Sequence, residues 1–329
     1  MKAELSVWMD EMAGKALLVI GDVVADRYID GRISRISREA PVLVLEEVGE
    51  KIVAGGSANV ANNGATLGGR IFAAGVVGTD GVGERLREVL GRNGVDTNTM
   101  VALEGRPTIS KTRIIAGGRA TVSQQIVRID RESKEPLSET AEKELLAGCL
   151  RLLPKVEGVV LSDYGSGTVT QEIRRSIIAA CRKKGIPTMV DSRYDVKSFH
   201  GIDYVKQNDG ELAAAVGRTL KTEEELFEAG QELLHSLDAA GVLVTRGEKG
   251  MVLFEADGSI HDIPVSDKSE VFDVSGAGDT CVAMFMLAIA AGAAPPAAAE
   301  LANIASGVAV RKMGTATVSA DELREILKQ

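Results

Sequence analysis

The feature that most constrains the fold is an alternation of short apolar runs with amphipathic segments between residues 139 and 245. The apolar runs have the length of buried strands, and the amphipathic segments have the length and periodicity of helices. Strands and helices that alternate in this way form a parallel sheet with helices on both faces, which is an α/β fold. The pattern predicts helices over 139–151 and 171–184, and strands over 16–20, 158–162, 188–190, 203–205 and 242–245.

Polar side chains recur where the predicted strands end. The carboxyl ends of parallel strands lie along one edge of the sheet, which is where α/β folds bind their ligands. A single polar residue at such a place could serve only a turn, but five that share one edge predict a binding site. These residues are Asp22, Asp163, Asp191, Asn208 and Thr245.

A second, smaller sheet is predicted beside the main body. No helix separates the strand at 16–20 from the strand predicted at 41–46, so the polar stretch 26–37 does not belong to a βαβ unit. Two further strands, 108–115 and 121–129, are joined by 116–120 and form a predicted hairpin. Basic side chains on these strands either contact an anionic substrate group or face solvent; they are Lys111, Arg113 and Arg128.

Three small residues precede an apolar helix that begins near residue 281. The first N–H groups of a helix lack intrahelical acceptors, and small residues let an anion approach them, so Gly276, Ala277 and Gly278 predict a phosphate cradle. Asp279 follows directly. A carboxylate would repel a stable anion, but beside a transferring phosphoryl group it can take the proton of an attacking hydroxyl. This arrangement suggests a kinase with Asp279 as the base, and a simple helix cap is the alternative.

A second glycine turn lies earlier in the chain. Gly55 and Gly56 precede a helix predicted over 60–67, and Asn59 stands between them and that helix. Glycines permit close approach of a ligand. Asn59 therefore either binds a polyol hydroxyl or caps the helix.

Two polar turns in the second half of the chain suit a nucleotide. Asn208 and Glu211 have an NxxE spacing at a strand-to-helix turn, where they could order Mg²⁺ largely through waters. The turn at 245–250 contains polar side chains and glycines that could meet phosphates. Each turn alone is a weak indication of a nucleotide site, and the two together are a stronger one.

Composition and the motifs that do not occur argue against several classes of protein function. The formal net charge of -9 over 329 residues disfavours non-specific nucleic-acid binding. The three cysteines are far apart, which predicts buried thiols in a reducing compartment. There is no signal-peptide pattern, and the longest apolar stretch, 281–291, is too short to span a bilayer, so we expect a cytoplasmic protein. P-loop, dinucleotide-fingerprint and zinc-ligand spacings do not occur.

Three motifs in order resemble the signatures of the PfkB family of ribokinase-like carbohydrate kinases over nearly the whole chain. They are Gly-Gly-Ser-Ala-Asn from Gly55, Asn-Asp-Gly-Glu from Asn208, and Asp-Val-Ser-Gly-Ala-Gly-Asp from Asp273. Further stretches resemble the D-glycero-β-D-manno-heptose 7-phosphate kinases, which also occur as the kinase half of bifunctional ADP-heptose synthases. These stretches are Asp26-Arg27-Tyr28, Ser34-Arg35-Ile36-Ser37, Glu39-Ala40-Pro41-Val42, Lys111-Thr112-Arg113, Arg128-Ile129-Asp130 and Ser162-Asp163-Tyr164-Gly165. The nucleotidyltransferase half of those synthases has no counterpart in this chain.

The resemblance implies one kinase domain over 1–329, folded as a three-layer α/β/α sandwich with a mostly parallel sheet. It implies a lid sheet, formed by about 26–50 and 105–130, that also acts as the clasp of a homodimer. The implied cofactors are ATP and Mg²⁺, with Glu211 reaching the Mg²⁺ through water, and a monovalent cation such as K⁺ near Asp273.

The resemblance also implies roles for single residues. Asp279 would be the base, and Gly276, Ala277 and Gly278 would form the anion hole. The residues implied to bind the sugar substrate are Asp22, Asp26, Arg27, Gly55, Gly56, Asn59, Lys111, Arg113 and Asp163. Those implied to bind the nucleotide are Asn208, Glu211, Thr245, Arg246, Gly247, Gly250 and, near the adenine, Asn303.

Three departures from the heptose kinase pattern leave the substrate open. Ser166 replaces a lysine, Asp191-Ser192-Arg193 replaces Asp-Pro-Lys, and Lys206-Gln207 replaces Thr-Pro. Arg193 or Lys206 could offset the lost lysine. The leading expectation is a heptose 7-phosphate 1-kinase. The alternatives are a kinase for another sugar phosphate, sugar or nucleoside; a non-catalytic sugar- or nucleotide-binding regulator; and, more remotely, a dehydrogenase.

Overall fold

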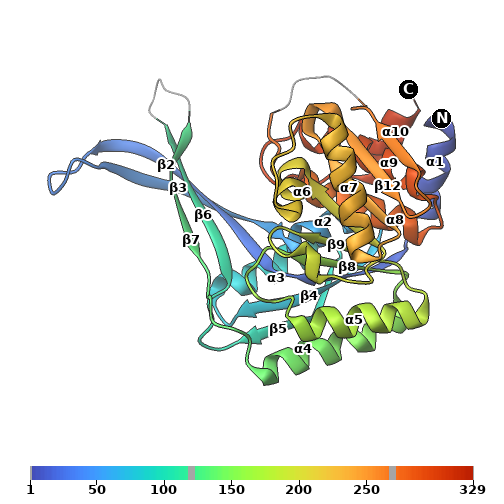
Figure 1. The fold of residues 1–329 in the computed structure, drawn as a ribbon. Helices are drawn as coiled ribbons and strands as arrows, with labels where there is room; N and C mark the ends of the chain where they lie inside the picture. The colour runs from blue at the N-terminus through green and yellow to red at the C-terminus, as the bar shows by residue number, and fades with distance from the viewer. Residues whose placement is uncertain (1, 118–122, 267–271, 329) are drawn as a thin grey trace.

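A central sheet organises the body of the protein. The computed structural model describes residues 2–117, 123–266 and 272–328. Within these residues the sheet has nine strands in the order β13-β12-β11-β10-β9-β8-β1-β4-β5, with helices on both faces (Figure 1). The strands from β11 to β5 are parallel, whereas β12 and β13 continue the sheet in antiparallel pairing. The bounds are β1 Ala16–Gly21, β4 Arg70–Gly78, β5 Asp96–Leu103, β8 Gly158–Asp163, β9 Thr188–Ser192, β10 Tyr204–Asn208, β11 Gly241–Thr245, β12 Met251–Glu255 and β13 Ile260–Ile263.

Two hydrophobic clusters, one on each face of this sheet, form the core. Alternate residues of a strand point to opposite faces. In β1, Leu17 and Val19 belong to one cluster, and Leu18 and Ile20 belong to the other. The helices of the first cluster are α1 Lys2–Glu11, α2 Ser57–Thr66, α3 Gly81–Arg92, α8 Ala277–Ala290, α9 Pro295–Ala309 and α10 Ala320–Leu327; those of the second are α4 Glu139–Leu152, α5 Gln171–Lys184, α6 Asp209–Val216 and α7 Glu223–Leu237. The predicted three-layer α/β/α sandwich is confirmed.

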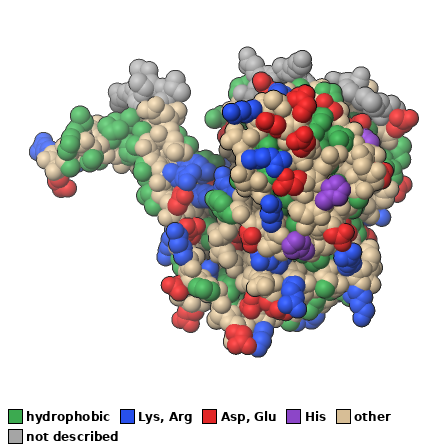
Figure 2. Space-filling model, viewed as in Figure 1, with side chains coloured by type: hydrophobic (Ala, Val, Ile, Leu, Met, Phe, Trp, Pro, Cys, Tyr) green, Lys and Arg blue, Asp and Glu red, His purple; other side chains and the backbone are tan. Residues whose placement is uncertain are grey.

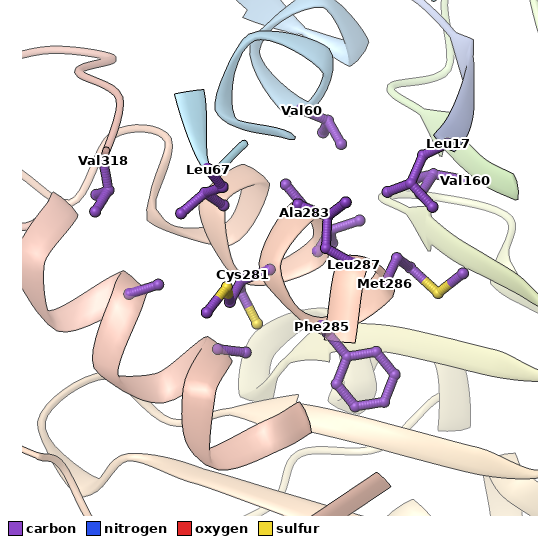
Figure 3. Packing of buried hydrophobic residues seen from close by; sticks show 14 of the residues in the cluster. Leu17, Val60, Leu67, Val160, Cys281, Ala283, Phe285, Met286, Leu287 and Val318 are labelled. Atoms are coloured by element: carbon purple, nitrogen blue, oxygen red, sulfur yellow. The ribbon is translucent and has the colours of Figure 1, made fainter. Parts of the chain in front are cut away.

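Helix α8 lies at the centre of the first cluster. Its residues from Asp279 to Ala288 are all buried, as expected for a helix that is apolar on every side. Leu287 and Met286 pack near Leu17 and Val160 of the sheet (Figure 3), and Phe285 meets the Tyr204 ring edge-on at 5.1 Å between ring centroids. This packing fixes the N-terminus of α8 at the carboxyl edge of the sheet. None of the described helices combines the length and the apolar character needed to cross a bilayer.

A second sheet, which we call the arm, projects from the body (Figure 1). Its strand order is β3-β2-β6-β7, with β2 antiparallel to β3, parallel to β6, and β6 antiparallel to β7. The bounds are β2 Val23–Ile36, β3 Leu43–Gly56, β6 Ile109–Gly117 and β7 Gln124–Arg131. The arm therefore corresponds to the small sheet expected from the sequence.

Several predicted boundaries were wrong. The polar stretch 26–37 carried no predicted strand, but its residues 26–36 form most of β2. The strand predicted at 41–46 continues as β3 to Gly56, and α2 begins at Ser57 rather than at 60. Residues 118–122 of the predicted hairpin lie outside the described residues.

Candidate active site

The Asp279 carboxylate is held between two hydrogen-bond donors at the start of α8. Asn59 Nδ2 donates to Asp279 Oδ2 at 2.6 Å, and Tyr164 Oη donates to Asp279 Oδ1 at 2.9 Å. The residue that caps α8 is Gly276, and it makes no side-chain cap hydrogen bond. The alternative interpretation of Asp279 as a helix cap is therefore wrong, because its carboxylate is directed at side chains of other elements.

Gly276 satisfies a steric requirement at this helix start. Its φ of 81° lies in the left-handed region, where residues with a side chain are strained. A Cβ at this position would lie 2.7 Å from Asn59 Nδ2. The glycine therefore permits both the turn into α8 and the approach of Asn59 to the carboxylate.

Burial raises the pKa of the Asp279 carboxyl to about 6. The nearby Asp191 carboxylate adds to this rise, while the hydrogen bonds from Asn59 and Tyr164 and the charge of Lys206 act in the opposite direction. A carboxylate whose pKa lies near neutral is suited to accept a proton from an alcohol at the moment of attack.

Lys206, on β10, places a buried ammonium beside the glycine loop. Its Nζ lies 3.3 Å from Asp191 Oδ2 and 3.8 Å from Glu211 Oε2. A Cβ built on Gly278 would lie 3.0 Å from that nitrogen. Burial opposes the charge on Lys206, but the two carboxylates outweigh it and hold its pKa above the ordinary value. A permanent positive charge therefore lies next to the predicted phosphate cradle.

Asp22 organises the turn that carries Tyr164. Its side chain is fully buried and accepts three backbone N–H donors, from Tyr164 at 2.9 Å and from Ser166 and Thr168 at 3.0 Å. Asp163 accepts from Ser192 Oγ at 2.8 Å and from Gly165 N at 3.0 Å. Both carboxylates, predicted as sugar ligands, thus already hold backbone turns, and their contact with a sugar stays a prediction.

The arm contributes charged side chains to the same region. Asp26 Oδ1 pairs with Arg113 Nη1 at 2.6 Å, and a Cβ on Gly55 would lie 2.6 Å from Asp26 Oδ2. Lys111 Nζ lies 5.8 Å from the centre of the Tyr164 ring. Figure 2 shows Lys and Arg side chains gathered where the arm meets the body. The structure therefore brings the predicted residues Asp26, Lys111 and Arg113 towards Asp279.

Two other arginines of the arm are paired within it. Arg27 Nη2 lies 2.7 Å from Glu50 Oε1, and Arg128 Nη2 lies 2.8 Å from Asp130 Oδ2. Arg128 is exposed, in agreement with the interpretation that it faces solvent.

The residues predicted for the nucleotide have structural partners of their own. Asn208 and Glu211 form a capping box at the start of α6, which sequence reasoning did not consider. The Arg246 guanidinium is buried and pairs with Asp262 and Glu223. Thr245 Oγ1 donates to the Gln207 carbonyl at 3.5 Å.

The other three residues predicted for the nucleotide are Gly247, Gly250 and Asn303, and close packing requires glycine at Gly250. A Cβ on Gly250 would lie 2.1 Å from the Ile263 carbonyl oxygen, so only glycine fits there. Gly247 begins a short 3₁₀ turn that ends at Lys249. On α9, Asn303 Nδ2 donates to the Pro264 carbonyl at 2.7 Å. Contact of these residues with a nucleotide stays a prediction.

No described group of three or more His, Cys, Asp or Glu side chains is arranged to hold a metal ion. The Asp273 carboxylate accepts from the backbone N–H groups of Ser275 and Gly314, both at 2.9 Å. Burial works against its charge, but these hydrogen bonds keep the pKa of Asp273 below its ordinary value. An anionic, backbone-supported carboxylate thus lies just before the glycine loop.

Several known proteins are similar to this chain in sequence. A model of the pfkB carbohydrate kinase family matches residues 15–322. The bifunctional protein HldE of Hyphomonas neptunium is 40% identical over 328 residues, covering 99% of this chain, and that of Gluconobacter oxydans is 42% identical over 324 residues, covering 98%. The chain spans only 66% of the length of each of these relatives.

Two solved structures show the same fold. Phosphofructokinase-2 from Escherichia coli in complex with potassium has a TM-score of 0.74 at 23% identity, covering 96% of this chain and 98% of that one. Arabidopsis thaliana ribokinase complexed with ribose and ATP has a TM-score of 0.72 at 21% identity, covering 96% of this chain and 99% of that one.

Proposed function

The chain belongs to the pfkB family of carbohydrate kinases, and we propose that it transfers the γ-phosphoryl group of ATP to a hydroxyl of a sugar phosphate. The observation that carries this proposal is the buried Asp279 carboxylate beside the glycine loop at the start of α8. Asp279 takes the proton of the attacking hydroxyl, and the N–H groups at the helix start stabilise the charge on the phosphoryl group.

The residues around the loop support ATP as the phosphoryl donor. The left-handed Gly276 permits the turn into α8, and the Lys206 ammonium next to Gly278 would supply a positive charge for the transferring group. Bound Mg²⁺ would neutralise phosphate charge, and Glu211 would orient it through water. The proposed roles of Thr245, Arg246 and Asn303 on the nucleotide side rest on their place at the carboxyl edge of the sheet.

We propose heptose 7-phosphate as the acceptor, phosphorylated at O1. The stretches of sequence shared with the heptose 7-phosphate kinases support this choice. Asp26 would accept hydrogen bonds from sugar hydroxyls, with Gly55 giving room for their approach. Lys111 and Arg113, at the base of the arm, would contact the phosphate of the substrate.

The test is ADP release with Mg–ATP on heptose 7-phosphate, sedoheptulose 7-phosphate, fructose 6-phosphate, ribose and adenosine, in KCl and in tetramethylammonium chloride. We expect a strong preference for heptose 7-phosphate and higher rates in KCl, because Asp273 would hold K⁺. Preference for another acceptor would support the proposal of a kinase and contradict heptose 7-phosphate as its substrate. ATP binding without turnover on any of them would favour the non-catalytic regulator.

We further propose a homodimer that forms through the arm. Large apolar side chains are exposed along it, whereas solvent-facing strands normally carry polar ones; they are Ile36, Val42, Leu43, Val48, Val127 and Ile129. Light scattering at micromolar concentration should give twice the mass of one chain. The double variant Val48→Lys/Ile129→Lys should give the single-chain mass, while Val7→Lys, at an exposed site on α1, should not. A monomeric wild-type protein would contradict the proposal.

A further inference from the structure

We propose that Tyr164 is a positioning residue for Asp279: its hydroxyl fixes the orientation of the carboxylate and stabilises the ionised form that accepts the proton. This inference rests on the proposed function of Asp279 as the base. It adds a role for a residue that neither the sequence motifs nor the family match assigns.

The geometry gives each carboxylate oxygen one donor from a different element. Oδ2 accepts from Asn59 on α2, and Oδ1 accepts from Tyr164 in the turn after β8. Donors on both oxygens prevent rotation of the carboxylate about its χ angles. The alcohol that approaches Asp279 therefore meets an acceptor whose direction is already set.

The amide of Asn59 is itself oriented by a buried chain of hydrogen bonds. Asn63 Nδ2 donates to Asn59 Oδ1 at 3.2 Å and to the Asn59 carbonyl at 2.9 Å. Thr280 Oγ1 donates to Asn63 Oδ1 at 2.9 Å. This chain leaves Asn59 Nδ2 directed at Asp279, so the first donor is fixed by residues of α2 and α8.

Tyr164 is fixed at both ends. Its backbone N–H donates to Asp22 Oδ2 at 2.9 Å, and its hydroxyl donates to Asp279. Burial, together with the Asp279 charge, holds the pKa of Tyr164 well above its ordinary value, so the phenol stays protonated and remains a donor. Lys111 lies over its ring on the side of the arm.

Other charges also face the carboxylate, from the strands packed beneath α8. Asp191 on β9 raises the pKa of Asp279, and Lys206 on β10 lowers it. No hydrogen bond among the described residues joins either side chain to the Asp279 carboxylate. The charges of Asp191 and Lys206 therefore act on it through space. The phenol and the Asn59 amide are the groups that give the carboxylate direction as well as charge stabilisation.

The test compares the titration of the Asp279 carboxyl in the wild type and in Tyr164→Phe, without substrate. Carbon-13 NMR of protein labelled at the aspartate carboxyl carbons monitors the titration. The Asp279→Asn variant assigns the resonance. Loss of a hydrogen bond to the ionised form should raise the midpoint by about one pH unit. The acid limb of kcat/KM should move by the same amount, with little change in the KM for ATP. Tyr194→Phe, at an exposed tyrosine, is the matched control and should move neither.

The two readouts separate this inference from the proposed function. An unchanged Asp279 midpoint in Tyr164→Phe would overturn the positioning role even in an active kinase. A shifted midpoint in a protein that phosphorylates no sugar would support the contact and contradict the kinase. If the variant does not fold, 3-fluorotyrosine labelling of the wild type replaces it. The Tyr164 fluorine signal should then follow the Asp279 titration, and its absence of response would overturn the inference.

Discussion

Replacement of Asp279 by Asn should lower kcat for sugar phosphorylation by about 10³-fold, within the range that general base catalysis contributes. The dissociation constant of ATP should change little, because backbone N–H groups form most of the phosphate cradle. Steady-state ADP release and calorimetric titration with ATP measure the two quantities. The control is Asp321→Asn, the same change in the exposed first turn of α10. A variant that keeps most of its turnover would show that Asp279 is not the base.

The pKa of Asp279 also predicts a pH dependence. Its value is raised to about 6, and only the ionised carboxylate accepts a proton. The wild-type kcat/KM should therefore rise with pH and level off above about 6, and fall tenfold per unit well below that value. An acid limb near the ordinary aspartate value would indicate that the carboxylate is solvated when the substrate is absent.

Replacement of Lys206 by Met should have the second largest effect. We expect kcat to fall by about 10²-fold, because a preorganised positive charge beside the phosphoryl group is lost. We also expect a loss of about 3–5 kcal/mol in the free energy of unfolding, because the buried Asp191 carboxylate loses its partner. Steady-state kinetics and urea denaturation measure the two losses.

A double variant separates these two roles of Lys206. Asp191→Asn together with Lys206→Met removes both charges of the buried pair, so most of the stability should return. Turnover should remain low, since the phosphoryl group still lacks its cation. Recovery of turnover together with stability would show that Lys206 serves the fold alone.

The sandwich could be predicted because its strands are buried on both faces. Continuous apolar runs such as 158–162 and 242–245 mark central parallel strands without reference to their neighbours. The arm was harder to predict, since the residues of β2 after its first four are partly or fully exposed, so that no buried apolar run marks the strand. Helix starts shifted for a local reason: Asn59 resembled a cap, but it lies inside α2 and faces Asp279.

The site was predictable only in part. Asp279 and its glycines are contiguous and form a recognisable pattern. Tyr164 lies 115 positions away from Asp279, and only the pairing of β8 with β1 and β9 brings it there. Asp22 followed a strand as a ligand would, yet its partners are backbone N–H groups more than a hundred positions later, which leave no mark on the sequence. Lys206 was noted as a departure, but its partners could not be inferred from the sequence.

The arm joins the body at the start of β2, the end of β3, the start of β6 and the end of β7, and the first two of these points are adjacent. Asp22 alone separates β1 from β2, and β3 passes directly into α2 at Gly56. A hydrogen bond joins these two connections, because Ser57 N donates to the Asp22 carbonyl at 3.0 Å. The paired strands β2 and β3 therefore leave the body beside Asp22 and end at the far tip of the arm, residues 37–42. A change in their angle at Asp22 would displace this tip more than the base, so a spectroscopic probe at the tip would report that change from a place away from the catalytic edge.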